Sequence, residues 1–352
     1  MPANLSSRSP SSTLPPGFVS ARVLDRQALT PQVTAFRLRL DTQGIPFHTT
    51  AGSHVEVLLD LGAGDEVRHY SVCAADGPEI TIAVLREEAG RGGSRHLHES
   101  VHPGTELRVR GPRNTFPYRA SGPAYFVAGG IGITPFLTMI AEADAAGIDW
   151  QLLYLGKHRE LMAYTAGLAA HGDRVTLWDS ASRGRADVAG ALRALPHETT
   201  IYACGPESLQ HALREAAAAT GHVIVIEDFD AGKTADTSGT ADTAGPSDAP
   251  LPGSDSAVSA DGRPSLPFTV ELADGSEIDV AADESILDAL NQAGFRALSS
   301  CKRGTCGTCE TPILEGTADH RDSVLSAEER DANETMMICV SRACGSRITL
   351  DL

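Results

Sequence analysis

The chain has 352 residues, a length that predicts two or three domains. Its formal net charge of −17 disfavours sequence-independent nucleic-acid binding, which needs a basic surface. Hydrophobic residues make up 41% of the chain, which excludes general disorder, and an aromatic content of 5% disfavours a base-stacking surface.

The N-terminal segment, residues 1–16, is rich in Ser and Pro and has no apolar core. This composition predicts a disordered tail rather than a signal peptide. Seven cysteines, an odd number, indicate thiols rather than a disulfide framework in a chain of this size. Together these features predict a cytoplasmic protein.

Residues 17–119 carry the pattern of a small antiparallel sheet or barrel. Turn residues separate runs of apolar alternation at 33–40, 54–61, 67–74, 79–86 and 105–110. Two motifs in this region could bind a flavin phosphate: Arg68-His69-Tyr70-Ser71 supplies a guanidinium and hydroxyls, and Gly90-Arg91-Gly92-Gly93-Ser94 supplies backbone amides. In isolation, the first motif is more typical of a strand with a surface arginine.

Residues 120–230 alternate between strand and helix, which predicts a parallel α/β sheet. Strands are expected at 125–128, 150–155, 175–178, 200–203 and 223–226, and helices at 135–146 and 206–220.

The first turn of this region, Ala128-Gly129-Gly130-Ile131-Gly132-Ile133-Thr134-Pro135, follows a strand and opens a helix. Thr134 is the expected helix cap and Pro135 suits the first helical position. The glycines interrupt the longest apolar stretch, 124–141, and disfavour a transmembrane helix. Such a helix N-terminus suits a pyrophosphate, although the motif is neither a Rossmann fingerprint nor a P-loop, and a purely structural turn stays an alternative.

Residues 231–265 consist mainly of Ala, Gly, Ser, Thr, Pro and Asp, a composition that predicts a flexible linker. The C-terminal unit, residues 266–352, opens with a predicted hairpin, 268–272 and 277–280, around an Asp-Gly turn. A helix over 285–293 is expected next, closed by Gly294, and a strand over 347–352 ends the chain.

Four cysteines of this unit have the spacing of iron–sulfur ligands. Cys301, Cys306 and Cys309 form C-x4-C-x2-C, and Cys339 follows downstream, which is the plant-type [2Fe–2S] pattern. A zinc site with four cysteine ligands is the alternative, but zinc ribbons pair two C-x2-C knuckles and this chain has one. We expect that Cys344 is not a ligand of the cluster.

His320 lies between the third and fourth cysteine. We expect it to be structural or on the surface, rather than a Rieske-like ligand.

These motifs occur in one order, and together they resemble the phthalate dioxygenase reductase family, within the wider ferredoxin–NADP reductase superfamily. The resemblance covers residues 17–230 and 266–352. It rests on RHYSVC, GRGGS, GPRNTFP, VAGGIGITPFL, YACGP, SCKRGTCGTCETPILEGTADHRDSVL and MMICVSRA. The family implies an antiparallel β-barrel flavin domain, a parallel α/β nucleotide domain and a C-terminal β-grasp plant-type ferredoxin domain.

The resemblance also implies which residues bind each cofactor. The barrel is expected to bind FMN, with FAD less expected, through Arg68, His69, Tyr70, Ser71, Ala83, Val84, Gly92, Gly93 and Ser94. Ser71 is placed near the flavin N5. The α/β domain is expected to bind NADH through Gly130, Gly132, Thr134, Asp179, Cys204, Gly205, Pro206, Glu227 and Phe229. Cys204 is placed near the nicotinamide without a nucleophilic role. The cluster ligands are Cys301, Cys306, Cys309 and Cys339. Two features depart from the family: His69 replaces a Thr-like residue, and the linker is longer than usual.

The expectation of NADH over NADPH rests on Asp179. Related NADPH enzymes place Ser-Arg after the third strand of the nucleotide domain, where this chain has Trp178-Asp179. A carboxylate suits a ribose hydroxyl and repels a phosphate. NADPH stays an alternative, because four cations lie near enough in sequence to weaken the argument: Arg183, Arg185, Lys157 and Arg159.

The family implies a reductase that passes electrons from NADH through FMN and a [2Fe–2S] cluster to a terminal oxygenase, most often a Rieske non-haem iron enzyme. The alternatives are an electron donor to a cytochrome P450, a stand-alone flavin reductase and a zinc-stabilised nucleotide-sensing module. No acid–base catalytic residue is expected, because the cofactors carry the redox chemistry. A monomer is expected, with neither nucleic acid nor membrane as partner.

Overall fold

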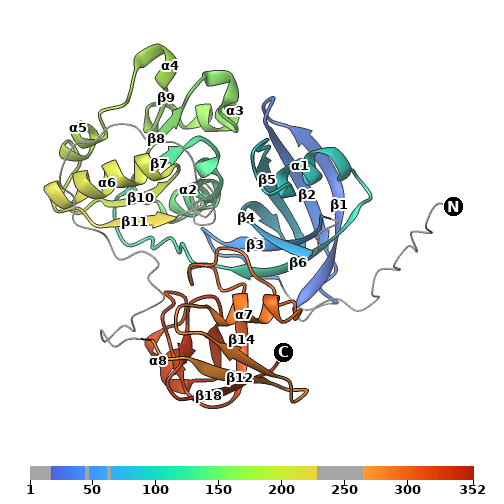
Figure 1. The fold of residues 1–352 in the computed structure, drawn as a ribbon. Helices are drawn as coiled ribbons and strands as arrows, with labels where there is room; N and C mark the ends of the chain where they lie inside the picture. Colours follow the sequence, from blue (N-terminus) through green and yellow to red (C-terminus); the bar gives the residue numbers. More distant parts are fainter. Residues whose placement is uncertain (1–16, 44–46, 62–64, 228–264) are drawn as a thin grey trace, which may run out of the picture. The chain divides into compact units, whose positions relative to one another are not determined.

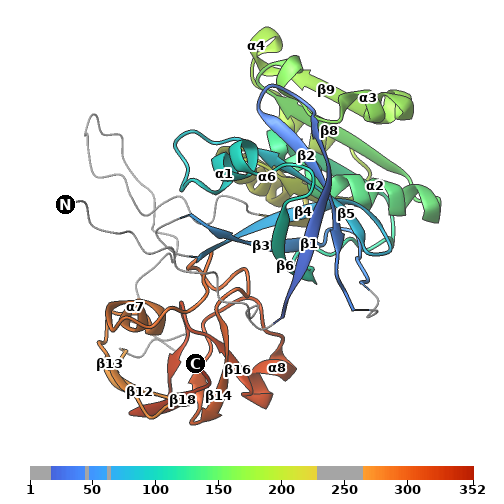
Figure 2. The same cartoon turned by 90° about the vertical axis from the view of Figure 1, so that its right-hand side faces the viewer.

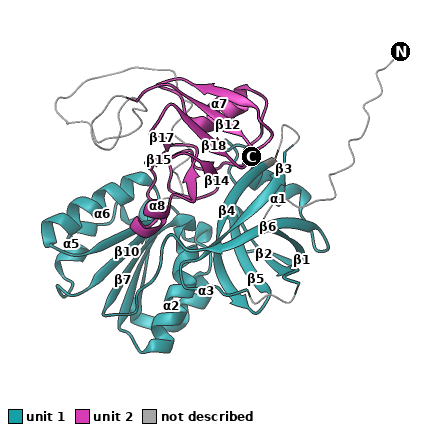
Figure 3. Cartoon of the chain, turned by 90° about the horizontal axis from the view of Figure 1, so that it is seen from below, with its two compact units in different colours: residues 1–228 teal, residues 229–352 magenta. Residues whose placement is uncertain are grey.

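A computed structural model describes residues 17–43, 47–61, 65–227 and 265–352 (Figure 1). The chain divides into two compact units, residues 1–228 and 229–352, which Figure 3 distinguishes by colour. The predicted tail and nearly all of the predicted linker lie outside the described residues, so the domain boundaries stay predictions. No helix in the described ranges is long and apolar enough to span a membrane.

The N-terminal half of unit 1 is a closed six-stranded antiparallel barrel, as predicted, with strand order β1-β2-β5-β4-β3-β6 (Figures 1 and 2). Its elements are β1 (Phe18–Ala28), β2 (Val33–Leu40), β3 (His54–Asp60), β4 (Asp65–Asp76), β5 (Glu79–Leu85), α1 (Gly93–Ser100) and β6 (Glu106–Arg113). Alternate residues of each strand fill the barrel, and α1 packs against them through Leu97, which is fully buried.

The second half of unit 1 is a five-stranded parallel sheet of order β11-β10-β7-β8-β9. Its strands are β7 (Ala124–Gly129), β8 (Trp150–Gly156), β9 (Val175–Asp179), β10 (Thr200–Cys204) and β11 (Ile224–Glu227). Its helices are α2 (Thr134–Ala146), α3 (Thr165–Leu168), α4 (Ser180–Arg183), α5 (Val188–Arg193) and α6 (Glu207–Thr220), with 3-10 turns η1 (Gly130–Ile133), η2 (Arg159–Leu161) and η3 (Ala169–Arg174). Buried side chains of α2 cover one face of the sheet, and those of α5 and α6 cover the other. This is the predicted parallel α/β domain.

The start of α2 differs from the prediction. Thr134 is not the helix cap, because η1 runs directly into α2 and gives Thr134 itself helical dihedral angles. Its Oγ1 instead donates to the carbonyl oxygen of Ile131 at 3.0 Å. Ile133 occupies the cap position, so Pro135 is the second helical residue and not, as predicted, the first, although it still lies in the first turn.

Unit 2 is built on a five-stranded mixed sheet of order β13-β12-β18-β14-β16. Its elements are β12 (Phe268–Leu272), β13 (Glu277–Val280), α7 (Ile286–Gln292), β14 (Glu310–Glu315), β15 (Ala318–Asp319), α8 (Ala327–Ala332), β16 (Thr335–Met337), β17 (Arg342–Ala343) and β18 (Arg347–Leu350). Strand β12 pairs in parallel with the central β18 and antiparallel with β13, and the sheet and α7 share one apolar core, as a β-grasp fold requires. Gly294 follows α7 with φ +90°, the left-handed conformation that ends helices.

Candidate functional site

The first candidate site lies where β4 meets the N-terminus of α1. Gly92 precedes the helix with φ +90°, a conformation that favours glycine. A Cβ atom on Gly93 would lie 2.9 Å from Nε of Arg68, so the arginine lies directly against the first helical turn. The Arg68 guanidinium also binds Glu66 and the carbonyl oxygen of Val67. A cation beside a helix N-terminus is an arrangement that binds phosphate.

A second cation near this site, Arg91, was not among the flavin-binding residues predicted from the sequence. Burial lowers the pKa of Arg91, and the positive charge of Arg68 lowers it further. Its position inside the Gly90–Ser94 motif could have identified it as a candidate phosphate-binding residue. Ser94 accepts a hydrogen bond on Oγ from the backbone N–H of Glu87 at 3.1 Å and thereby holds the loop.

Tyr70 and Ser71 follow Arg68 on β4. Burial raises the pKa of Tyr70, so its hydroxyl stays protonated. Ser71 is 3% exposed, and its Oγ has no hydrogen-bond partner in the part of the chain that the structure describes. Burying an unpaired hydroxyl costs about 1–3 kcal/mol, so this atom fits a polar group of a bound ligand. The residues at this end of the barrel therefore fit a flavin.

The other predicted residues of the barrel separate into two environments. The side chain of Val84 lies in the barrel core, whereas Ala83 packs with Cys73 and Tyr164, where the barrel contacts the α/β domain. His69 lies on the outer surface of β4, with Nε2 at 3.4 Å from Oε1 of the fully buried Glu56. The structure thus brings Ala83 toward the α/β domain and keeps Val84 away from it.

The second candidate site lies at the carboxyl edge of the parallel sheet. The adjacent strands β7 and β10 end there in two turns. A Cβ on Gly132 would lie 2.3 Å from the carbonyl oxygen of Cys204, and one on Gly129 would lie 2.7 Å from Cδ of Pro206. The two turns therefore pack directly against each other and require glycine. Gly130 has φ +57° and open space where a Cβ would be, which leaves the edge accessible.

At the end of β11, Glu227 pairs in register with Cys204. Burial raises the pKa of Glu227 to about 8, and a hydrogen bond with Cys204 opposes that rise. Its Oε2 lacks a hydrogen-bond partner among the described residues, so a neutral carboxyl group is left to bind a ligand such as a nicotinamide carboxamide. Gln210, which sequence reasoning missed, donates from Nε2 to the carbonyl oxygens of Gly205 and Glu227 at 2.9 and 3.4 Å. The predicted Phe229 lies outside the described residues.

Asp179 ends β9 at the same edge of the sheet and is the N-cap of α4. Burial acts to raise the pKa of Asp179, but the backbone N–H groups of Ser182 and Arg159, which donate to its carboxylate at 3.2 Å, lower that pKa overall. The carboxylate is therefore ionised. Nearby, the guanidinium of Arg183 lies over the ring of Trp178 at 4.3 Å. This edge of the site therefore presents both a fixed negative charge and a stacked cation.

The third candidate site is in unit 2, in the loop before β14 and directly after β16. Hydrogen bonds from Cys306 and Cys339 lower the pKa of Cys301, and a hydrogen bond from Cys339 lowers that of Cys309. Side-chain hydrogen bonds thus join Cys301 to Cys306 and Cys339, and join Cys339 to Cys309. Cys344 is exposed.

His320 lies away from solvent, with 8% of its side chain exposed and Nδ1 at 3.8 Å from Oδ1 of Asp322. Asp322 accepts hydrogen bonds from the backbone N–H groups of Val324 and Leu325 at 3.0 and 2.9 Å. Both ring nitrogens of His320 are buried without a hydrogen-bond partner among the described residues, so its structural role stays a prediction.

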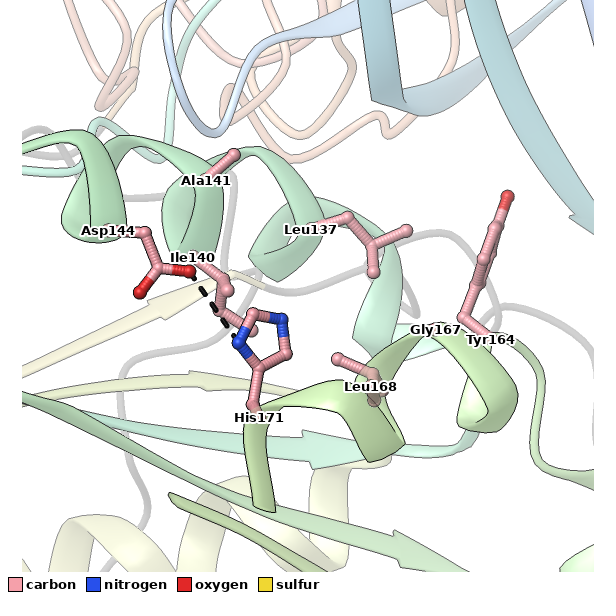
Figure 4. Close-up of a pocket in the computed structure, with 8 residues that line it drawn as sticks. All are labelled: Leu137, Ile140, Ala141, Asp144, Tyr164, Gly167, Leu168 and His171. Carbon is pink, nitrogen blue, oxygen red and sulfur yellow. Dashed lines mark ion pairs between the residues drawn. The ribbon is translucent and has the colours of Figure 1, made fainter. Parts of the chain in front are cut away.

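A separate hollow of about 230 Å³ lies between α2 and the α3–η3 segment (Figure 4). Asp144 and His171 form an ion pair of 3.6 Å at one end, and Tyr164 stands at the other (Figure 4). Asp144 also binds Arg174 and Trp150, so its charge is engaged in holding the helices together. The remaining lining residues are Leu137, Ile140, Ala141, Gly167 and Leu168. None of the cofactor-binding residues predicted from the sequence lines this hollow.

Comparisons with known proteins match both units. The family described as "Oxidoreductase FAD-binding domain" matches residues 20–118, and the family described as "2Fe-2S iron-sulfur cluster binding domain" matches residues 271–344. The second match favours [2Fe–2S] over the zinc alternative.

Similar proteins extend over nearly the whole chain. The carnitine monooxygenase reductase subunit of Escherichia coli (strain K12) is 37% identical over 334 residues, covering 93% of this chain and 96% of that protein. The structure of phthalate dioxygenase reductase, described as modular for electron transfer from pyridine nucleotides to [2Fe–2S], is 30% identical with a TM-score of 0.60 and covers 96% of this chain and 98% of that one.

An intact type IV self-sufficient cytochrome P450 monooxygenase is 36% identical with a TM-score of 0.73; the match covers 99% of this chain, which spans 43% of that one. Fold, motifs and whole-length similarity agree. The chain belongs to the phthalate dioxygenase reductase family and is an oxidoreductase with flavin, pyridine-nucleotide and [2Fe–2S] domains in one polypeptide.

Proposed function

We propose that this chain is the NADH-dependent reductase component of an oxygenase system, delivering electrons through FMN and a [2Fe–2S] cluster to a terminal oxygenase of the Rieske non-haem iron type. The observation that carries this proposal is the plant-type spacing of Cys301, Cys306, Cys309 and Cys339 in a unit that matches the 2Fe-2S iron-sulfur cluster binding domain, in a chain whose unit 1 carries the candidate flavin and nucleotide sites. Such a chain contains an entry and an exit for electrons.

The residues of unit 1 have positioning roles in this proposal. Arg68 and Arg91 hold the flavin phosphate at the start of α1, and Ser71 hydrogen-bonds the flavin ring. Gly132 lets the two turns of the sheet edge pack closely, and the protonated Glu227 holds the nicotinamide by its carboxamide. A bound flavin supplies the conversion of two-electron hydride transfer into the single-electron transfers that an iron–sulfur cluster accepts.

FMN is proposed over FAD because the Arg68 guanidinium lies against the first turn of α1, and Arg91, in the glycine-rich loop before that helix, adds a second positive charge nearby. This arrangement suits the doubly charged phosphate monoester that ends FMN. NADH is proposed over NADPH because the ionised Asp179 repels a ribose 2′-phosphate. Arg183, held over Trp178, is the residue that could reverse this preference.

The proposal is tested on the purified full-length chain by its absorption spectrum, its flavin and iron content, and its reduction by NADH without oxygen. We expect one FMN, two irons and two inorganic sulfides per chain, and a [2Fe–2S] EPR signal after NADH is added. A colourless zinc protein would contradict the proposal. FAD in place of FMN would contradict the flavin assignment alone.

A cytochrome P450 is the second candidate partner, favoured by the similarity to one part of the self-sufficient P450 chain. The two partners are distinguished by supplying the reduced chain with a Rieske oxygenase or a P450 and measuring product per NADH consumed. We expect coupled turnover with the Rieske enzyme. A rate of NADH oxidation that is equally high without any partner would instead support a stand-alone flavin reductase. A cytoplasmic monomer, the state expected from the sequence, belongs to the same proposal and is tested by fractionation and light scattering.

A further inference from the structure

A cluster of charged and polar side chains lies on the outer face of the barrel, beside the candidate flavin site. On β3, Val55 and Val57 point into the barrel core, so His54 and Glu56 point outward. Both outward residues are nevertheless buried: His54 is 4% exposed and Glu56 has no exposed surface. Polar side chains are rarely buried in this way without partners.

Glu56 is held from both neighbouring strands. It pairs in register with His69 of β4 and with Arg110 of β6. Arg110 Nε donates a hydrogen bond to Oε2, Arg113 Nε lies 4.0 Å from the same oxygen, and His69 Nε2 lies 3.4 Å from Oε1. These groups balance the charge of the buried carboxylate.

The ring of His69 in turn holds His54. The two imidazoles stack with centroids 5.0 Å apart and an interplanar angle of 16°. Burial lowers the pKa of His54 to about 3, with the neighbouring His69 contributing to the shift, so the ring is neutral. Its orientation is therefore fixed by a chain of contacts that ends at the ion pairs of Glu56.

One atom of this cluster lacks a partner. Nε2 of His54 makes no hydrogen bond to any described residue, although it is buried. His54 pairs in register with Ser71, whose Oγ is also buried without a hydrogen-bond partner among the described residues. Residues opposite each other on antiparallel strands have Cβ atoms about 4.5–5.5 Å apart, so the two side chains extend from adjacent positions on one face of the sheet. A single polar ligand edge placed there would satisfy both.

We propose that His54 is a second hydrogen-bonding residue for the flavin ring, acting beside Ser71, and that the stacked His69 and the buried Glu56 position its imidazole. This inference rests on the proposed flavin site and goes beyond it, because it assigns the buried cluster on the outer face of β3 to the cofactor. The neutral ring can donate from Nε2 or accept there, and Glu56 with its two arginines acts only through His69.

The test compares three substitutions in the full-length chain by FMN dissociation constant and flavin midpoint potential, neither of which requires turnover. His54→Leu removes the hydrogen bond, His54→Asn places its amide near the Nδ1 position, and His54→Gln places an amide nitrogen near the Nε2 position. We expect FMN binding about tenfold weaker in His54→Leu and His54→Asn, with a shifted midpoint potential, and recovery of most of both properties in His54→Gln.

Thr199→Val is the matched control. Thr199 is 4% exposed, its Oγ1 is also unsatisfied among the described residues, and it immediately precedes β10, whose other end reaches the candidate nucleotide site. We expect it to leave FMN affinity and potential unchanged. Thermal unfolding of the flavin-free variants identifies a variant that fails to fold, in which case His54→Asn replaces His54→Leu as the decisive comparison.

Wild-type chain that binds FMN, together with folded His54→Leu and His54→Asn variants of unchanged affinity and potential, would overturn the assignment of His54 while the proposed function stands. Equal losses in the Leu, Asn and Gln variants would also overturn it, because the effect would then follow the lost imidazole and not Nε2. Wild-type chain without affinity for either FMN or FAD would refute both proposals.

Discussion

The cluster site of unit 2 and the flavin site of unit 1 are built in opposite ways. Three of the four proposed cysteine ligands lie in one loop, and only Cys339 is supplied from further along the chain. The flavin site instead draws on β3, β4 and the start of α1, and His54 meets Ser71 only because two strands pair in one register. A local site is encoded by spacing, whereas a site assembled across strands depends on the fold. The first should fail completely when one ligand is lost, and the second should weaken by degrees.

The largest effect is expected at the cluster. Cys306→Ser should remove or alter the [2Fe–2S] EPR signal, because each iron needs its full set of thiolates. Cys344→Ser is the control and should keep the signal, since Cys344 is exposed and lies outside the plant-type ligand spacing. Loss of the signal in the Cys344 variant alone would show that the ligand set is wrong.

The buried carboxyl group of unit 1 gives a graded, pH-dependent effect. Its folded pKa of about 8 lies above the ordinary value of 4.5, so the stability that protonated Glu227 contributes is complete below pH 4.5 and is lost as the pH rises through 8. Between pH 6 and pH 8.5, the free energy of unfolding of flavin-free wild type should fall by about 2 kcal/mol more than that of Glu227→Gln. Both tryptophans, Trp150 and Trp178, lie in this domain, so their fluorescence reports its unfolding.

Equal losses in wild type and Glu227→Gln over this pH range would mean that Glu227 is already ionised in the folded protein. The neutral carboxyl group assigned to the nicotinamide site would then be wrong.

Removing either arginine proposed to bind the phosphate should weaken FMN binding without abolishing it. Arg68→Ala and Arg91→Ala should each weaken FMN binding by about 10- to 100-fold, the usual range for a charge-assisted hydrogen bond. The measurement is fluorescence titration at two ionic strengths, and riboflavin, which lacks the phosphate, is the control ligand. If the two variants weaken riboflavin binding as much as FMN binding, the arginines do not hold the phosphate.

The smallest effect is expected in nucleotide choice. Asp179→Asn keeps a side chain that caps α4 and removes the charge, so the fold should be preserved. The ratio of kcat/KM for NADH over NADPH should fall by about tenfold or less. An unchanged ratio in this variant, with a large change in Arg183→Ala, would assign the discrimination to the arginine instead.

The strand alternation and Gly turns sufficed to predict both architectures of unit 1, and the hairpin 268–272 and 277–280 agrees with β12 and β13. Two elements of the barrel were missed. The strand β1 contains Arg22, Asp25 and Arg26 among its apolar residues, which obscures its alternation, and α1 is a helix that follows a glycine-rich motif without an apolar run.

The buried charge cluster could not be predicted for a different reason. Glu56 and Arg110 are far apart in sequence, and each reads as an ordinary surface residue of a strand. Only strand register places them, with His69, around one carboxylate. Likewise Gln210 lies on a helix without a motif, and its role at the sheet edge follows from where α6 packs.

The central claim is that electrons leave this chain only through the cluster of unit 2. It is tested most directly by comparing the full-length chain with a fragment ending near residue 230, measuring NADH-driven reduction of ferricyanide and of the oxygenase partner. The fragment retains the described residues of the flavin and nucleotide sites and lacks all four cluster cysteines. We predict that it reduces ferricyanide at a rate similar to that of the full chain and does not reduce the partner. An unchanged ratio of the two rates would show that the flavin site feeds the partner directly and would contradict the serial path.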